Sequence, residues 1–119
     1  MKKYVITDIP PSNNKYIGTG GRGANFKYQE EKRKWEWMVL EAVGRNKPSD
    51  PLEKAVVRLT YYFPTRHKRD PDNYSGKFLL DGLVKAKVIE DDSFNCIDLE
   101  IVGKLDRDNP RTEITIKEV

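Results

Sequence analysis

The sequence contains a single cysteine, Cys96, and a single histidine, His67, in 119 residues. One cysteine excludes a disulfide within the chain and favours a reducing, cytoplasmic setting. One residue of each type also excludes a structural zinc site built from cysteine and histidine. No apolar run approaches the ~20 residues that a transmembrane helix needs. The basic N-terminus is not followed by a long apolar segment, so we expect neither a secretory signal nor membrane association.

A strong excess of charge of either sign is also lacking, since 22 Lys and Arg oppose 19 Asp and Glu, for a net charge of +3. This mild excess permits a nucleic-acid partner without requiring one. Charged residues make up 34% and apolar residues 37%, which is too charged for a membrane protein and too apolar in its patterning for a disordered chain. The length corresponds to one domain, which we expect to span residues 1–119.

The spacing of apolar residues and turn residues predicts six structural elements. They are a strand at 4–9, a helix at 27–43, a strand at 54–63, a helix at 71–87, a strand at 97–101 and a strand around 114–116. The order β-α-β-α-β-β predicts an α+β domain, with a mixed sheet of about four strands and both helices packed on it. We expect the last two strands to pair as an antiparallel hairpin.

Two carboxylates, Asp70 and Asp72, stand at the start of the second predicted helix, and the pair Asp91–Asp92 follows later. Carboxylate oxygens are the ligands that Mg²⁺ prefers, and Mg²⁺ supports hydrolysis of phosphodiesters. The pattern therefore fits a metal-dependent nuclease site. It also fits a simple helix start, because Asp is a common N-cap and proline, here Pro71, is common at the first helical position.

Lys77 has two interpretations of the same kind. It precedes Asp81 by four positions, so it fits a surface ladder of Lys77, Asp81 and Lys85 on the predicted helix. It also shares a predicted helix face with Asn73, from which its ammonium would stabilise charge that develops on a phosphate. His67 lies among basic residues, and we interpret it as a surface group.

Basic residues flank the acidic segment, since Arg66, Lys68 and Arg69 come directly before Asp70. Charge runs of this kind usually form solvated loops. Residues 18–23 match the pattern G-x-G-x-x-G, but they do not follow a strand directly, which argues against a nucleotide site. We interpret this region as a loop whose basic residues contact phosphates or are simply exposed.

Together these features resemble the RusA family of Holliday-junction resolvases. The resemblance rests on residues 9–16 (IPPSNNKY), on residues 66–73 (RHKRDPDN), on Lys77, on Asp81-Gly82-Leu83 and on Asp91-Asp92. One departure is that four residues separate Asp72 from Lys77, one more than in the family's pattern.

The resemblance implies a Mg²⁺-dependent endodeoxyribonuclease, with Mn²⁺ able to substitute, that resolves Holliday junctions in DNA recombination and repair. It implies a homodimer that acts on four-way-junction DNA. It further implies that Asp70, Asp72 and Asp92 bind the metal and that Lys77 assists catalysis, with Asp91 as a ligand if the register differs by one. We expect the DNA contacts to come from Lys15, Arg22, Lys27, Arg66, Lys68, Arg69 and Asn73.

Two other functions compete with this one. A non-catalytic module that binds branched DNA would use the same basic loops. A phosphatase with an aspartyl nucleophile also carries Asp-x-Asp, but that motif follows a buried strand and continues with threonine. Here a basic loop precedes Asp70 and Tyr74 occupies the threonine position, so we rank the phosphatase last.

Overall fold

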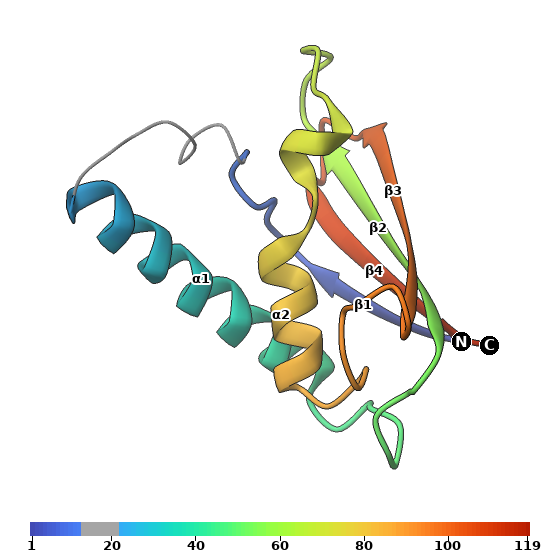
Figure 1. The fold of residues 1–119 in the computed structure, drawn as a ribbon. Coiled ribbons are helices and arrows are strands. Elements are labelled where there is room, and N and C mark those ends of the chain that lie inside the picture. The colour runs from blue at the N-terminus through green and yellow to red at the C-terminus, as the bar shows by residue number, and fades with distance from the viewer. Residues whose placement is uncertain (13–21) are drawn as a thin grey trace.

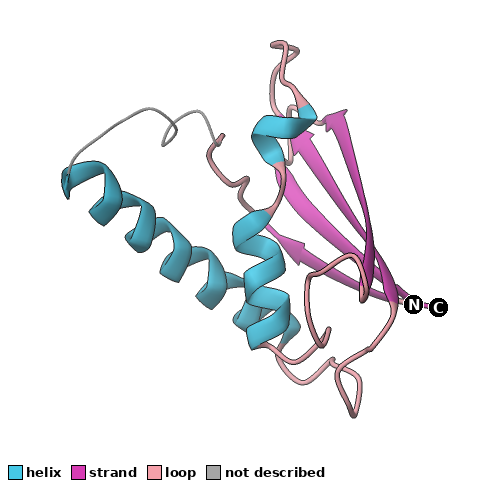
Figure 2. Cartoon of the chain, viewed as in Figure 1, coloured by secondary structure: helices cyan, strands magenta, loops and turns pink. Residues whose placement is uncertain are grey.

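The computed structural model describes residues 1–12 and 22–119, with side chains from residue 26 onward in the second range. Its elements are β1 (Lys2–Ile6), α1 (Arg22–Val43), β2 (Ala55–Phe63), the 3₁₀ turn η2 (Pro71–Tyr74), α2 (Lys77–Lys85), β3 (Ile97–Leu105) and β4 (Arg111–Glu118). The four strands form one mixed sheet, and both helices lie on one side of it (Figures 1 and 2). The predicted α+β fold is therefore confirmed. No helix in the described ranges is long and apolar enough to cross a membrane.

The strand order is β1-β4-β2-β3, so the predicted hairpin of the last two strands is wrong. β3 pairs with β2 in parallel, and β4 lies antiparallel between β1 and β2. The connection 106–110 crosses the end of β2, where the backbone N–H of Asp106 donates to the carbonyl of Phe63 at 2.8 Å. This central position buries both Ile114 and Ile116 between two neighbouring strands, which a place at the edge of the sheet would not do.

The predicted strand at 54–63 is confirmed as β2, and its residues Ala55, Val57, Leu59, Tyr61 and Phe63 are all buried on the side that faces the helices. The helices cover these residues with fully buried side chains, chiefly Trp35 and Val39 of α1 and Leu79 and Leu83 of α2. Burying an apolar side chain of this size contributes about 1.5–3 kcal/mol. The core therefore anchors α2, and with it the segment that leads into α2, to the sheet.

Glycine at position 82 lets the two helices approach closely. A Cβ atom built at Gly82 would lie 2.7 Å from Cβ of Val39, which is closer than real Cβ atoms come. α1 ends at Val43, and Gly44 follows with φ of +53°, the left-handed conformation that glycine commonly adopts just past the end of a helix. α1 begins at Arg22, earlier than the predicted Lys27.

The predicted continuous helix at 71–87 is wrong, because the chain breaks at Gly76. η2 ends at Tyr74, and Gly76 adopts left-handed backbone angles, with φ of +78°, before α2 begins at Lys77. A Cβ at Gly76 would overlap Cδ1 of Leu59, so no larger residue fits there without rearrangement. An isolated glycine within a helical pattern is often tolerated, which is why the sequence alone does not locate this break.

Candidate active site

Asp70 enters η2 in an extended conformation, with φ of −100° and ψ of 137°. Its backbone carbonyl accepts a hydrogen bond from the N–H of Asn73 at 3.0 Å, while its side chain makes no capping hydrogen bond. Pro71 stands at the start of the turn, where its fixed φ and missing N–H are favourable. The turn therefore forms without the Asp70 carboxylate, which is exposed, and the helix-start explanation of Asp70 loses its main support.

Packed aromatic rings support this turn. Tyr74 of η2 packs edge-on against Phe63 at 5.2 Å between ring centroids, and against Tyr61 at 5.7 Å. Asp70 borders a cavity of about 250 Å³ lined by Tyr61, Phe63, Arg69, Asp70, Pro71, Tyr74, Ile101 and Gly103. The Tyr61 hydroxyl is buried with no hydrogen-bond partner among the described residues, and burial raises its pKa, so it stays protonated. Packed rings fix the backbone that carries Asp70.

Arg69 closes the loop in front of Asp70. Its guanidinium lies 4.3 Å above the Phe63 ring. It donates to the carbonyl of Thr65 at 2.9 Å, to the carbonyl of His67 at 3.2 Å and to Oγ1 of Thr65 at 2.8 Å. This internal role was missed at the sequence level, where Arg69 is one of several adjacent cations. DNA contact by Arg69 stays a prediction, but much of its hydrogen-bonding capacity is already used.

The other predicted DNA contacts lie in different parts of the molecule. Arg66 and Lys68 are exposed in the loop between β2 and η2, and Lys27 is exposed on α1. Asn73 is half-buried in η2. Lys15 lies outside the described residues, as does the side chain of Arg22. The contacts themselves stay predictions.

The predicted helix face shared by Lys77 and Asn73 is wrong, because Lys77 begins α2 whereas Asn73 lies in η2. Its Nζ lies 3.8 Å from Oδ2 of Asp81, and its side chain is 63% exposed. Lys85 instead pairs with Glu36 of α1 at 2.8 Å. Half of the predicted ladder is therefore present, and a role for Lys77 in chemistry stays a prediction.

The later carboxylates precede β3. Asp91 is exposed and Asp92 is partly buried, at the border of a second cavity of about 550 Å³. Its lining residues are Leu80, Asp92, Ser93, Phe94, Ile97, Asp98 and Leu99. The two cavities share no lining residue, but Leu99 borders one and Ile101 the other. These two residues follow each other on one face of β3, about 7 Å apart along the strand. Asp70 and Asp92 thus border neighbouring hollows on the helix side of β3.

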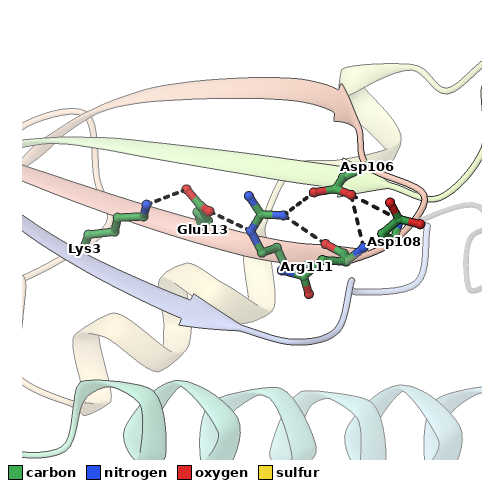
Figure 3. Close-up of polar contacts among 6 residues, drawn as sticks. Lys3, Asp106, Asp108, Arg111 and Glu113 are labelled. Atoms are coloured by element: carbon green, nitrogen blue, oxygen red, sulfur yellow. Dashed lines mark hydrogen bonds and ion pairs between the residues drawn. The ribbon is translucent and has the colours of Figure 1, made fainter.

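A second cluster of charges lies at the turn between β3 and β4 (Figure 3). Arg111 donates through Nε to Glu113 at 2.7 Å and through Nη1 to Asp106 at 2.8 Å, and Lys3 pairs with Glu113 at 3.0 Å. The hydrogen bond from Arg111 holds the pKa of Asp106 below its usual value. Burial raises the pKa of Glu113, but the bonds from Arg111 and Lys3 outweigh it and leave that pKa lowered. We call these four residues the arginine network.

The family model for endodeoxyribonuclease RusA matches residues 8–117. The chain belongs to the RusA endodeoxyribonuclease family. This match confirms the resemblance, and it spans η2, Lys77 and the Asp91–Asp92 pair. No match to a curated protein was found.

The metal ligands expected for a RusA-family protein are not gathered into one set. Among the residues that the structure describes, no group of three or more His, Cys, Asp or Glu side chains is arranged to hold a metal ion. The donor chemistry suits a hard cation, because Asp70, Asp72, Asp91 and Asp92 all supply carboxylate oxygens. Their assignment as ligands stays a prediction.

Proposed function

We propose that the chain is a divalent-metal-dependent endodeoxyribonuclease that resolves four-way DNA junctions during recombination and repair in the cytoplasm. Membership of the RusA family supports nuclease chemistry. The observation that carries the assignment of the site is Asp70, whose exposed carboxylate caps nothing although it stands at the start of a turn. A carboxylate that does not stabilise its own element is suited to binding a ligand.

In this proposal Asp70, Asp72 and Asp92 hold Mg²⁺, with Asp91 as the alternative to Asp92, and Mn²⁺ substitutes because it also prefers oxygen ligands. When bound there, such an ion would supply Lewis-acid chemistry, a water molecule of lowered pKa and a polarised phosphoryl group. Lys77, exposed at the start of α2, supplies positive charge to the phosphate in the transition state.

The chain's own residues position the DNA. Exposed Arg66 and Lys68 lie in the loop that leads to Asp70, so a phosphate backbone held by them passes close to that carboxylate. Cations of this kind provide affinity that depends on salt and little on sequence. We also propose a homodimer, because a two-fold dimer presents two equivalent sites to the two equivalent strands of a junction.

The deciding experiment is incubation with a synthetic four-way junction, with and without Mg²⁺, beside a linear duplex of the same arm sequence. We expect symmetric cuts in the junction that require Mg²⁺ or Mn²⁺, and little cutting of the duplex. Equal cutting in excess chelator would contradict the metal-dependent mechanism. Equal cutting of duplex and junction would contradict specificity for junctions.

A non-catalytic module for branched DNA remains the second candidate, and the lack of a converged ligand set among the described residues favours it. Such a module would bind the junction in a gel-shift assay and leave its strands intact in every metal tested. Cutting that is lost in a folded Asp70→Asn variant, with binding retained, would exclude it.

A further inference from the structure

The two edges of the sheet differ in length and exposure. β1 forms one edge with five residues, and β3 forms the other with nine. β3 pairs only with β2, so its outer backbone groups have no strand partner among the described elements (Figure 1). Proteins usually keep such edges short or cover them, because a long open edge pairs readily with another strand. The open edge of β3 is therefore a candidate interface.

The side chains of β3 favour pairing. Its register with β2 places Ile97, Leu99, Ile101 and Leu105 on the helix side of the sheet. Leu99 is 39% exposed and Leu105 38%, and Phe94, just before the strand, is fully exposed. Phe94 and Leu99 also line the cavity of about 550 Å³ beside Asp92. An apolar strip thus runs along an edge that nothing in the described structure covers.

The other side of β3 carries charges of both signs. Glu100 already pairs with Arg58 of β2 at 2.7 Å. Asp98 and Lys104, near opposite ends of the strand, are exposed and form no ion pair among the described residues. Opposite charges at the two ends of one strand become complementary when the strand meets an antiparallel copy of itself.

We propose that β3 pairs antiparallel with β3 of a second copy, about a two-fold axis through Ile101. Asp98 of each copy then lies opposite Lys104 of the other, so the ion pair forms twice. Ile97 lies opposite Leu105, which brings an exposed leucine to the rim of the cavity beside Asp92. Leu99 lies opposite Gly103, whose missing side chain leaves room for it. The occupant of this edge is thus a second copy of the chain.

Other registers fit less well. The axis must keep side chains of the same face together, so it shifts only in whole residues along the strand. An axis through Glu100 would place that carboxylate against itself, and like charges directly opposite are unfavourable. An axis through Val102 would set Asp98 against Asp106 and leave Ile97 without a strand partner. The axis through Ile101 pairs all nine residues of β3.

This interface rests on the homodimer in the proposed function and assigns a surface to it. Asp92 lies in the segment that leads directly into β3, so the edge-to-edge dimer places the two copies of that segment near the interface. The junction would then meet two sites that are held in a fixed relation by one continuous eight-stranded sheet.

The test is a charge swap measured by sedimentation equilibrium over a range of concentrations. Asp98→Lys or Lys104→Asp alone sets like charges opposite each other twice, and we expect either to weaken dimerisation about ten-fold or more, since two opposite-charge pairs are lost and two like-charge pairs replace them. The double variant restores the opposite charges and should recover most of that loss. Circular dichroism checks that each variant is folded.

Trp37→Ala is the matched control, because Trp37 is also a large exposed apolar residue, at 63%, but lies on α1. We expect it to leave dimerisation unchanged. If neither single swap weakens dimerisation, or if Trp37→Ala weakens it instead, the β3 interface is overturned while the proposed dimer itself stands. A wild-type protein that is monomeric at all concentrations would overturn both the β3 interface and the proposed homodimer. Nuclease activity is tested separately, by the junction-cleavage assay.

Discussion

The arginine network and the segment around Asp70 contain the same kinds of side chain in opposite states. In the network every carboxylate is matched to a cation, with Arg111 between Asp106 and Glu113 and Lys3 beyond (Figure 3). Near η2, the Asp70 carboxylate and the cations of Arg66 and Lys68 form no ion pair among the described residues. Charges that are matched within the chain stabilise it, whereas charges left open remain available to a ligand.

The backbone around each region supports this contrast. Asp106 also accepts hydrogen bonds from the N–H groups of Asp108 at 3.2 Å and Asn109 at 3.1 Å, so its carboxylate organises its own turn. The Asp70 carboxylate organises nothing, because packed rings and the Arg69 guanidinium hold that segment instead. A carboxylate that does not stabilise its own segment can be substituted without unfolding the protein, so the comparison can be tested by substitution.

The largest expected effect is on catalysis, from Asp70→Asn. Removing one charged ligand costs several kcal/mol of transition-state stabilisation, or about 10³-fold or more in the single-turnover rate. The Tm should hardly change, because the carboxylate makes no capping bond. Junction affinity should stay level or rise as one repelling charge is removed.

Asp50→Asn is the control, since Asp50 is an exposed carboxylate in the turn before β2. The Asp50→Asn variant should cleave the junction at the wild-type rate. If Asp70→Asn is instead unfolded by circular dichroism, Asp70 belongs with the structural charges and the contrast fails.

Lys77→Ala should come next, with a loss of ~10²–10³ in single-turnover rate if its ammonium stabilises the transition state. Its exposed pair with Asp81 predicts a stability change of only about 0.2–0.5 kcal/mol. Lys85→Ala offers the opposite profile, because Lys85 is similarly exposed but pairs with the buried Glu36. That variant should lower the Tm and leave the rate per folded molecule unchanged. Wild-type cleavage by folded Lys77→Ala would return Lys77 to a surface role.

Arg111→Ala should show the reverse of Asp70→Asn. It leaves Asp106 and Glu113 without their shared cation and removes the guanidinium that lies 3.8 Å from the Tyr62 ring. We expect the Tm to fall by several degrees, while the folded fraction cleaves junctions at the wild-type rate. A stable but inactive Arg111→Ala protein would place the network in the active site and contradict the comparison.

Acid should reduce the difference between wild type and Arg111→Ala. The folded-state pKa values of Asp106 and Glu113 are lowered from 3.8 and 4.5. Each carboxylate therefore contributes its stabilisation fully above its unfolded-state pKa, and loses it as the pH falls through the lower, folded-state pKa. Chemical denaturation at pH 7 and at steps below pH 4 measures this difference. A gap between the two proteins that stays constant with pH would mean that packing on Tyr62, and not charge pairing, carries the effect.

The sequence predicted what depends on periodicity. The strand at 54–63 and the helix at 27–43 were predicted correctly apart from the start of the helix, because buried apolar side chains at a fixed spacing leave a direct pattern. Gly76 was missed, since its left-handed conformation follows from contact with Leu59, which is distant in sequence. The place of β4 was missed for the same reason, because apolar alternation is the same in a central strand and in a hairpin partner.

Prediction of the candidate active site from the sequence was limited in a similar way. The residue types of segment 66–73 singled it out as a candidate site, which stays a prediction, whereas the chain's membership of the RusA family is confirmed. The sequence did not separate Arg69 from its exposed neighbours, because only the fold brings Phe63 beneath its guanidinium. Which charges are matched is a property of tertiary structure, and that property distinguishes the two regions compared above.

The smallest expected effect separates two adjacent cations of the loop, Lys68 and Arg69. Lys68 is exposed and makes no ion pair among the described residues, so Lys68→Ala should weaken junction binding modestly and reduce the slope of log affinity against log salt by about 1. Arg69→Ala should lower the Tm, because it removes the contact with Phe63 and the bonds to Thr65. Binding measured from 50 to 300 mM salt, beside thermal melts of both variants, tests this division. If Lys68→Ala leaves the salt slope unchanged, or if Arg69→Ala changes only the slope, then exposure and pairing do not decide which loop cations bind DNA.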